Sequence, residues 1–197
     1  KLKTPNAVPI FPKTYRKVIN KLGLGVEYDL MVLEALLSLC KEEEGLYALN
    51  VSPTSLRNTK YFEYAKELLK SSKAKIIFVL SEQEYYGQTD KYNMILDSLK
   101  KQGSLIAIDR VGSIHTSFLY LRELNIDIIR FDNYYSQSNK IAQNLAILEG
   151  FTLMAKDKKI KTWMKNIESP ELLQAAKKIQ VEYLQGKHLS ELQEFIS

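Results

Sequence analysis

Acidic, amide and basic side chains stand at or near the ends of a series of short apolar segments. Segment 105–133, LIAIDRVGSIHTSFLYLRELNIDIIRFDN, shows the pattern, with Asp109 and Arg110 at the end of one apolar run. In chain order the polar residues at such ends are Asn50, Glu82, Asp109, Arg130 with Asp132, Lys165 and Gln185. Asparagine, glutamate and aspartate offer the hard oxygen ligands that suit Mg²⁺ or Mn²⁺. Asn50, Glu82 and Asp109 are therefore a candidate ligand set for one divalent ion.

Six predicted strands must position these residues. They span 46–52, 74–82, 104–110, 127–132, 160–166 and 181–186, and each is apolar on both faces or nearly so, as in strands covered on both sides. Segments with apolar residues at helical spacing separate them, and a further helix is expected over about 27–43. Ser52-Pro53 and Ser169-Pro170 are predicted to begin helices, because proline suits the first helical turn.

Repeated alternation of strand and helix predicts a parallel sheet with right-handed crossovers, as an open doubly wound sheet or a β/α barrel. No Gly-x-Gly-x-x-Gly follows a strand and no Gly-Lys-Ser/Thr occurs, which disfavours dinucleotide binding and excludes a P-loop. In a β/α barrel all strands end at one rim, where active sites are built. Polar strand ends also occur simply because strands meet solvent there, so the whole set carries more weight than any one residue.

Composition narrows the class of protein. The 197 residues suit a single domain, with 45% hydrophobic and 26% charged residues, as in ordinary globular proteins. No apolar run reaches 18 residues and the first residues lack a signal-peptide core, so neither a membrane span nor a leader is expected. Cys40, the one cysteine, is expected in the core, which fits a reducing cytoplasm. The net charge is +5, but lysines are spread along the chain and no nucleic-acid-binding module is visible.

Several segments follow one another in a specific order: IFPKTYRKVINKLGL, ALNVSPTSL, FVLSE, AIDRVGSIHTSFLYLRELNIDIIRFD, MKNIES and YLQG. Their order and spacing resemble the EAL domain, a bacterial β/α barrel that hydrolyses cyclic di-GMP. IFPKTYRKVINKLGL is similar to the family's Phe-Ile-Pro helix start, ALNVSPTSL to Val-Asn-Leu-Ser-Pro-x-x-Leu, and FVLSE to the strand ending in Thr-Glu. AIDRVGSIHTSFLYLRELNIDIIRFD resembles Asp-Asp-Phe-Gly-Thr-Gly-Tyr-Ser-Ser-Leu with its sequel Leu-Lys-Ile-Asp, MKNIES resembles Ala-Glu-Gly-Val-Glu-Thr, and YLQG resembles the Gln-Gly segment. The resemblance covers nearly the whole chain and implies a TIM-like β/α barrel of the EAL type, in a single domain over 1–197.

The resemblance also implies roles for individual residues. It matches Asn50, Glu82 and Asp109 to metal ligands of the family. The remaining matches are Arg130 at a catalytic-site lysine, Asp132 at the acid two residues later, and Gln185 at a glutamine near the metal-bound water.

Two departures from the family pattern alter the expected chemistry. Arg110 replaces the second aspartate of the Asp-Asp pair, and Lys165 replaces a glutamate that the family uses in catalysis. Two-metal hydrolysis of a phosphodiester needs anionic ligands for both ions. The two cations predict loss of the second metal and little or no hydrolysis. No cofactor is therefore expected, and Mg²⁺ or Mn²⁺ would serve only residual activity.

Two classes of function follow. The first is a degenerate, non-catalytic EAL domain that acts as a regulatory or protein-interaction module in bacterial signalling. The second is a receptor that binds cyclic di-GMP without hydrolysis, or an active phosphodiesterase. In a receptor, Arg110, Arg130 and Lys165 would bind the phosphates, and Tyr134 and Tyr135 would stack on a base or else pack on the loop surface. If the basic side chains of the rim pair with acidic side chains of the rim itself, the first class is favoured. If they stay unpaired and leave the rim positive, the second class is favoured.

The N-terminal part carries a separate expectation. The family's Glu-Ala-Leu motif normally lies on a strand before the helix that IFPKTYRKVINKLGL resembles, and no such strand precedes that helix in the sequence. Six strands are found where the family has eight positions. The first two are expected upstream, leaving a barrel incomplete at its N-terminus. Exposed strand edges tend to pair with a further strand, so we expect a missing N-terminal piece, a homodimer or a swapped segment to close the gap. His115 and His188 have no partner at metal-ligand spacing and are assigned no role.

Overall fold

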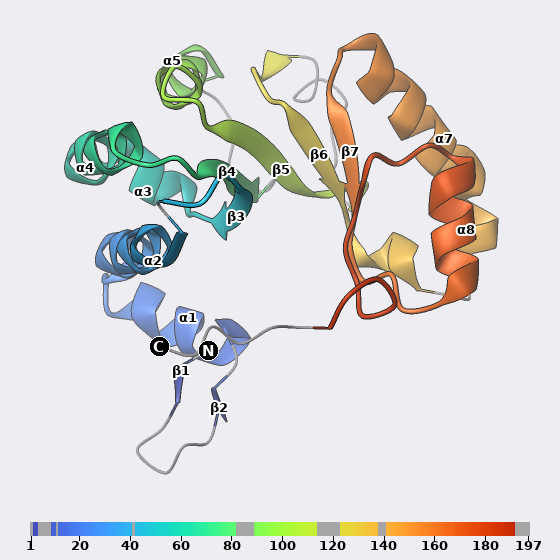
Figure 1. Ribbon diagram of the computed structural model, residues 1–197, viewed down its shortest axis with the longest axis horizontal. Helices are drawn as coiled ribbons and strands as arrows, with labels where there is room; N and C mark the ends of the chain where they lie inside the picture. The colour runs from blue at the N-terminus through green and yellow to red at the C-terminus, as the bar shows by residue number, and fades with distance from the viewer. Residues whose placement is uncertain are drawn as a thin grey trace. The chain divides into compact units, whose positions relative to one another are not determined.

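The computed structural model describes residues 2–3, 9–10, 12–40, 42–81, 89–113, 123–137 and 141–191. The chain folds as two compact units, Lys1–Ile76 and Ile77–Ser197 (Figure 1). Helices alternate with strands along the chain, and the larger unit holds a parallel sheet. The predicted α/β class is therefore confirmed.

The first unit is mainly helical. It contains β1 (Leu2–Lys3), β2 (Pro9–Ile10), α1 (Pro12–Lys21), α2 (Gly25–Cys40), β3 (Leu46–Asn50), α3 (Pro53–Arg57), α4 (Thr59–Lys70) and the first residues of β4 (Lys75–Ser81). The helix expected over 27–43 is α2, which begins and ends slightly earlier, and Cys40 at its end is buried and free as expected. β1 and β2 pair antiparallel and were not predicted, because two residues are too short to show a period.

A buried carboxylate ties the end of β3 to the helices of the first unit. Asp29 on α2 accepts hydrogen bonds from the Ser52 backbone N–H and from the Ser55 hydroxyl, both at 2.8 Å. Ser52 caps α3 through its own hydroxyl, as the Ser52-Pro53 pair predicts. Arg16 on α1 donates to Asp29 at 3.4 Å and to the carbonyl oxygen of Asn50 at 3.3 Å. These contacts fix the backbone around Asn50, one of the predicted site residues.

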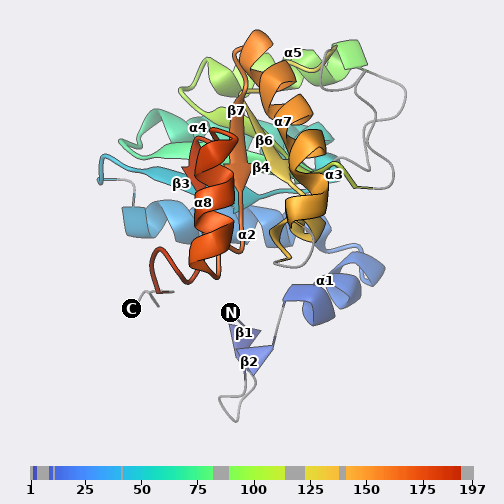
Figure 2. The same cartoon turned by 90° about the vertical axis from the view of Figure 1, so that its right-hand side faces the viewer.

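The second unit holds the parallel strands in the order β4-β5-β6-β7-β8. Its further elements are α5 (Thr89–Lys100), β5 (Leu105–Val111), β6 (Ile128–Phe131), η2 (Asn133–Ser136), α7 (Ile141–Asp157), β7 (Lys161–Met164), α8 (Pro170–Lys178) and β8 (Tyr183–Leu184). Each of these strands lies within a predicted segment except β5, which ends at Val111, one residue beyond the predicted end, and Ser169 caps α8 as expected. In both views α7 and α8 lie on the same side of β7 (Figure 2).

Apolar side chains from neighbouring strands hold the sheet of the second unit together. Ile77 and Val79 on β4, Ala107 on β5, Ile128 on β6 and Trp163 on β7 form one buried cluster. Because the strand centres are apolar, the polar side chains of these strands concentrate at the strand ends, as the sequence predicts.

The pairing of β5 with β6 brings two predicted site residues side by side. Asp109 is the register partner of Arg130, and Val111 is the partner of Phe131, so Arg110 forms a bulge with no partner of its own. Arg110 has φ of 66°, in the left-handed region that few non-glycine residues adopt. The bulge turns the side chain of Arg110 away from the regular alternation of β5.

Candidate functional site

Asp109, near the end of β5, forms ion pairs with two basic side chains. Arg130 on β6 donates from Nε to Oδ1 at 2.8 Å and from Nη2 to Oδ2 at 2.7 Å. Lys165, directly after β7, donates from Nζ to Oδ1 at 2.9 Å. The Arg130 contact is bidentate, which is the strongest geometry for an arginine–carboxylate pair. Both carboxylate oxygens of Asp109 therefore accept hydrogen bonds from cations.

The Asp109 ion pairs are shielded from solvent. The side chains of Asp109, Arg130 and Lys165 are 16%, 9% and 17% exposed. Burial alone raises the pKa of Asp109, but the hydrogen bonds and charges of Arg130 and Lys165 outweigh it and hold the pKa below its ordinary value. Asp109 is thus ionised at neutral pH, and its charge is neutralised by the protein itself.

Arg110 makes a second ion pair beside the first. Its Nε lies 3.3 Å from Oδ2 of Asp132, and its side chain is 47% exposed against 19% for Asp132. The other oxygen of Asp132 accepts the Tyr134 backbone N–H at 2.9 Å and caps η2. The backbone N–H of Arg110 donates to Asp109 at 2.8 Å. Arg110 therefore stays at the strand ends, where its guanidinium pairs with Asp132.

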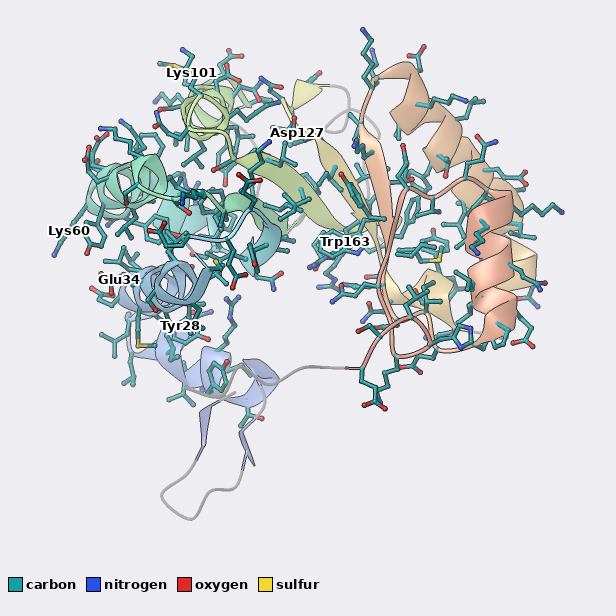
Figure 3. All side chains as sticks on the ribbon, viewed as in Figure 1. Tyr28, Glu34, Lys60, Lys101, Asp127 and Trp163 are labelled. Atoms are coloured by element: carbon teal, nitrogen blue, oxygen red, sulfur yellow. The ribbon has the colours of Figure 1, made fainter. Side chains whose placement is uncertain are left out.

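Trp163 is a site residue that the sequence reasoning missed. The guanidinium of Arg130 lies 4.7 Å from the centroid of the Trp163 ring, within cation–π distance (Trp163 is labelled in Figure 3). Trp163 is also the register partner of Arg130 across β6 and β7. Once these two strands are aligned, their pairing would have indicated the contact.

A cavity of about 700 Å³ opens beside these residues in the second unit. Its lining residues are Arg130, Lys165, Asn166, Glu168, Leu184, Gln185, Gly186, Lys187, Leu189, Ser190 and Glu191. Gln185, a predicted site residue, is held by its carbonyl oxygen, which accepts the Ile167 N–H at 2.9 Å. A Cβ on Gly186 would lie 2.1 Å from the Ile167 carbonyl oxygen, so this close approach requires glycine. Both acidic and basic side chains line the cavity, such as Glu168 and Lys187, and the sequence did not predict them.

The two rim tyrosines differ in exposure. Tyr135 is buried, and its hydroxyl donates to the Gly112 carbonyl oxygen at 2.9 Å, so this ring packs on the loop and is closed to a stacking base. Tyr134 is 43% exposed and meets Tyr135 edge-on. Of the two alternatives for these tyrosines, stacking on a base or packing on the loop surface, Tyr135 therefore shows packing.

The structure brings several of the predicted site residues together, but Asp109 is the only member of the candidate ligand set that the described residues place there. Asp109, Arg130, Lys165 and Gln185 lie in the second unit, around the ion pairs and the cavity. Asn50 ends β3 in the first unit, whereas Glu82 and His115 lie outside the described residues.

The described residues do not fit a divalent cation at Asp109. Both oxygens of Asp109 already face cationic donors, Oδ1 from Arg130 and Lys165 and Oδ2 from Arg130, and these positive charges would repel a divalent ion at the same carboxylate. No cluster of three acid, histidine or cysteine side chains able to hold a metal occurs within the ranges that the structure describes.

Comparisons with known proteins place these observations in a family. A family model described as the EAL domain matches residues 1–191. The cyclic di-GMP phosphodiesterase PdeF of Escherichia coli (strain K12) is 24% identical over 196 residues, which cover 94% of this chain and 26% of that protein. The cyclic di-GMP phosphodiesterase PdeA of Borreliella burgdorferi is 25% identical over 178 residues, with 86% and 27% covered. The chain thus spans about a quarter of the length of these curated relatives.

Solved structures share the fold. The FimX EAL domain from Pseudomonas aeruginosa bound to c-di-GMP has a TM-score of 0.84 and 19% identity, covering 97% of this chain and 80% of that chain. The Xanthomonas citri FimX EAL domain in complex with c-di-GMP has a TM-score of 0.83 and 15% identity, covering 96% and 79%. These likenesses confirm the predicted barrel-type fold.

Proposed function

Because the chain belongs to the EAL domain family, we propose that it serves cyclic di-GMP signalling as a regulatory domain that does not hydrolyse the dinucleotide. One observation carries the proposal: the carboxylate of Asp109 is already neutralised by Arg130 and Lys165. The family's metal-dependent hydrolysis would need this carboxylate as a ligand.

Electrostatics supports the loss of hydrolysis. Arg110 stands where the resemblance expects a second carboxylate, and Lys165 stands where it expects a glutamate. Like unit charges 4 Å apart repel by about 4 kcal/mol at an effective dielectric constant of about 20, and a divalent ion is repelled more strongly. Each of the two positions therefore opposes an ion that the family residue would attract.

The pairing within the rim favours a regulatory or protein-interaction role. Arg110 pairs with Asp132, and Arg130 and Lys165 pair with Asp109, so three cations meet two carboxylates. A rim built to capture phosphates would leave more of this positive charge unpaired. On this proposal the domain transmits a signal through contact with a partner protein.

A specific observation favours a second candidate, a receptor for cyclic di-GMP. The cavity of about 700 Å³ is large enough for a small ligand, and Lys187, Gln185 and the edge of Lys165 line it. Such a receptor would bind the dinucleotide without metal.

Titration calorimetry with cyclic di-GMP, with and without Mg²⁺, tests both candidates, together with chromatography of the reaction mixture. We expect no linear dinucleotide under Mg²⁺ or Mn²⁺, and its release would overturn the proposal. Metal-independent heat that Lys187→Glu abolishes, and that Lys60→Glu on α4 leaves unchanged, would establish the receptor. No heat in either condition would leave the interaction module.

A further inference from the structure

The positive charge of the chain is concentrated at one end. Residues 1–26 hold no aspartate or glutamate, whereas the rest of the sequence balances 22 basic against 23 acidic side chains. The basic residues of this segment are Lys1, Lys3, Lys13, Arg16, Lys17 and Lys21. Charge asymmetry of this kind marks a surface that meets a polyanion or an anionic membrane.

The last turn of α1 and the residues directly after it carry exposed apolar side chains beside these lysines. Val18 is 54% exposed, Leu22 is 65% exposed and Leu24 is 48% exposed, and Lys17 and Lys21 are exposed next to them. Positions 17, 18, 21 and 22 are spaced at one helical turn, so they share one side of the helix. We call Lys17, Val18, Lys21, Leu22 and Leu24 the α1 outer face.

The capping of α1 holds the α1 outer face in a defined shape. Gly23 has φ of 71°, its N–H donates to the Asn20 carbonyl at 3.1 Å, and the Leu24 N–H donates to the Ile19 carbonyl at 3.0 Å. These two hydrogen bonds form a Schellman motif, which fixes Leu24 against the last turn. The apolar residues are thus arranged before any partner binds.

The opposite side of α1 is anchored within the first unit. The Tyr15 hydroxyl lies 2.9 Å from the Tyr28 hydroxyl on α2, and Arg16 lies 5.6 Å from the centroid of the Tyr28 ring (α1 and α2 lie together in Figure 1). Arg16 also pairs with buried Asp29. α2 therefore accounts for one side of α1 and leaves the α1 outer face open.

We infer that the α1 outer face docks on an anionic phospholipid surface. Val18, Leu22 and Leu24 would enter the boundary between headgroups and acyl chains, and Lys17 and Lys21 would meet lipid phosphates. No helix within the described ranges is long and apolar enough to cross a membrane. A nucleic acid would use the lysines but would give the three apolar side chains nothing to contact. This inference goes beyond the proposed function and does not depend on it.

Vesicle sedimentation of the whole chain tests the inference. We expect the protein to bind vesicles of mixed phosphatidylglycerol and phosphatidylcholine, and to stay in solution with phosphatidylcholine alone. Binding should weaken about tenfold or more in Lys17→Glu/Lys21→Glu, because each lysine near an anionic surface contributes to the attraction. It should also weaken in Val18→Ser/Leu22→Ser, whose exposed positions tolerate polar side chains without loss of fold, as circular dichroism will verify.

A matched variant separates this surface from a general charge effect. Lys177→Glu/Lys178→Glu on α8 changes the net charge equally, at two exposed lysines in a last helical turn. It should bind vesicles as the unchanged protein does. The inference would be overturned if both charge variants lost vesicle binding equally, or if the unchanged protein did not bind anionic vesicles. It would also be overturned if Val18→Ser/Leu22→Ser bound vesicles as the unchanged protein does. Tighter binding to duplex DNA than to vesicles at the same salt would also overturn it.

Discussion

Arg130 has a different role in the Asp109 ion pairs from Lys165. Arg130 is nearly buried, meets both oxygens of Asp109 and lies against the Trp163 ring. Lys165 makes a single contact and is somewhat more exposed. A planar guanidinium suits a bidentate and stacked place that an ammonium cannot fill in the same way. Arg130 is therefore the principal partner of Asp109.

Substitution of the two cations should show this difference. We expect Arg130→Ala to lower the free energy of unfolding by about 3 kcal/mol, because it leaves a buried carboxylate with one partner. Lys165→Ala should cost about 1 kcal/mol, since the bidentate pair remains. Urea denaturation followed by circular dichroism measures both changes. A larger loss in Lys165→Ala than in Arg130→Ala would contradict this ranking.

The lowered pKa of Asp109 predicts how stability depends on pH. An unfolded aspartate titrates near about pH 4, and in the folded chain Arg130 and Lys165 hold the pKa of Asp109 below that value. The stabilisation is therefore complete above about pH 5 and is lost as the pH falls through the folded pKa. The stability difference between the unchanged protein and Asp109→Asn, measured in urea from neutral to acidic pH, should be flat at first and then shrink below about pH 4. A difference that grows on acidification would contradict the assignment.

The sequence predicts the polar residues of this site better than their partners. The ends of the strands carry Asp109, Arg130 and Lys165 as foreseen, because strand position follows from apolar runs. The Arg130–Trp163 contact depends on strand register, which periodicity does not define. The left-handed Arg110 could not be foreseen either, because arginine rarely adopts a positive φ and the apolar run before it predicts regular strand backbone.

At the scale of elements, the strand ends are held by short segments packed on one another. The Gln185 carbonyl oxygen bonds to the Ile167 N–H, and Gly186 lies against the backbone of Ile167. This contact joins the segment after β8 to the segment after β7, which carries Lys165. The position of the Lys165 ammonium therefore depends on a glycine in another loop.

A pair of glycine substitutions tests this dependence. Gly186→Ala should destabilise the protein by about 2–3 kcal/mol, because its Cβ would meet backbone that cannot move aside. Gly150→Ala on α7 meets nothing within 4 Å and should stabilise it by about 0.5–1 kcal/mol, since alanine favours the helix. Thermal unfolding of the two variants measures both effects. Similar midpoints for the two would contradict the close packing at Gly186.

The same scale explains which elements the sequence reveals. Six strands and the helix starts at Ser52 and Ser169 are predicted, because apolar runs and Ser-Pro pairs are local signals. The expectation that every strand is covered on both faces fails for β3 and β8, which are largely exposed or half-buried. β1 and β2 are too short to show a period, and the predicted start and end of α2 differ from the structure by a few residues. One of the segments with helical spacing between the predicted strands, SIHTSFLYLREL, falls largely on residues 114–122, outside the described ranges.

At the scale of the whole molecule, the stability should not depend on divalent cations. A ligand stabilises a protein only when it binds the folded state, and the internal cations already neutralise Asp109. Closure of the barrel by an upstream piece or a second copy stays a prediction.

Thermal unfolding with millimolar Mg²⁺ or Mn²⁺, and with a chelator, tests this independence. We expect the midpoint to change by less than about 1 °C, because no binding free energy is added or removed. The double variant Arg110→Asp/Lys165→Glu should show a higher midpoint with Mn²⁺ than with the chelator, because it removes two opposing cations. A rise of about 4 °C or more in the unchanged protein would contradict the internal neutralisation.

The carboxylate shared by Arg130 and Lys165 also bears on how such a rim can evolve. Because both cations meet one acid, the effect of a substitution at one position depends on the residue at the other. A lone Lys165→Glu change would set a second carboxylate beside Asp109, and their repulsion would destabilise the fold unless an ion were bound. On the proposed function, a change to a metal-binding rim that began with Lys165→Glu would therefore pass through a less stable intermediate. The two ion pairs would then make such a change harder than the number of substitutions suggests.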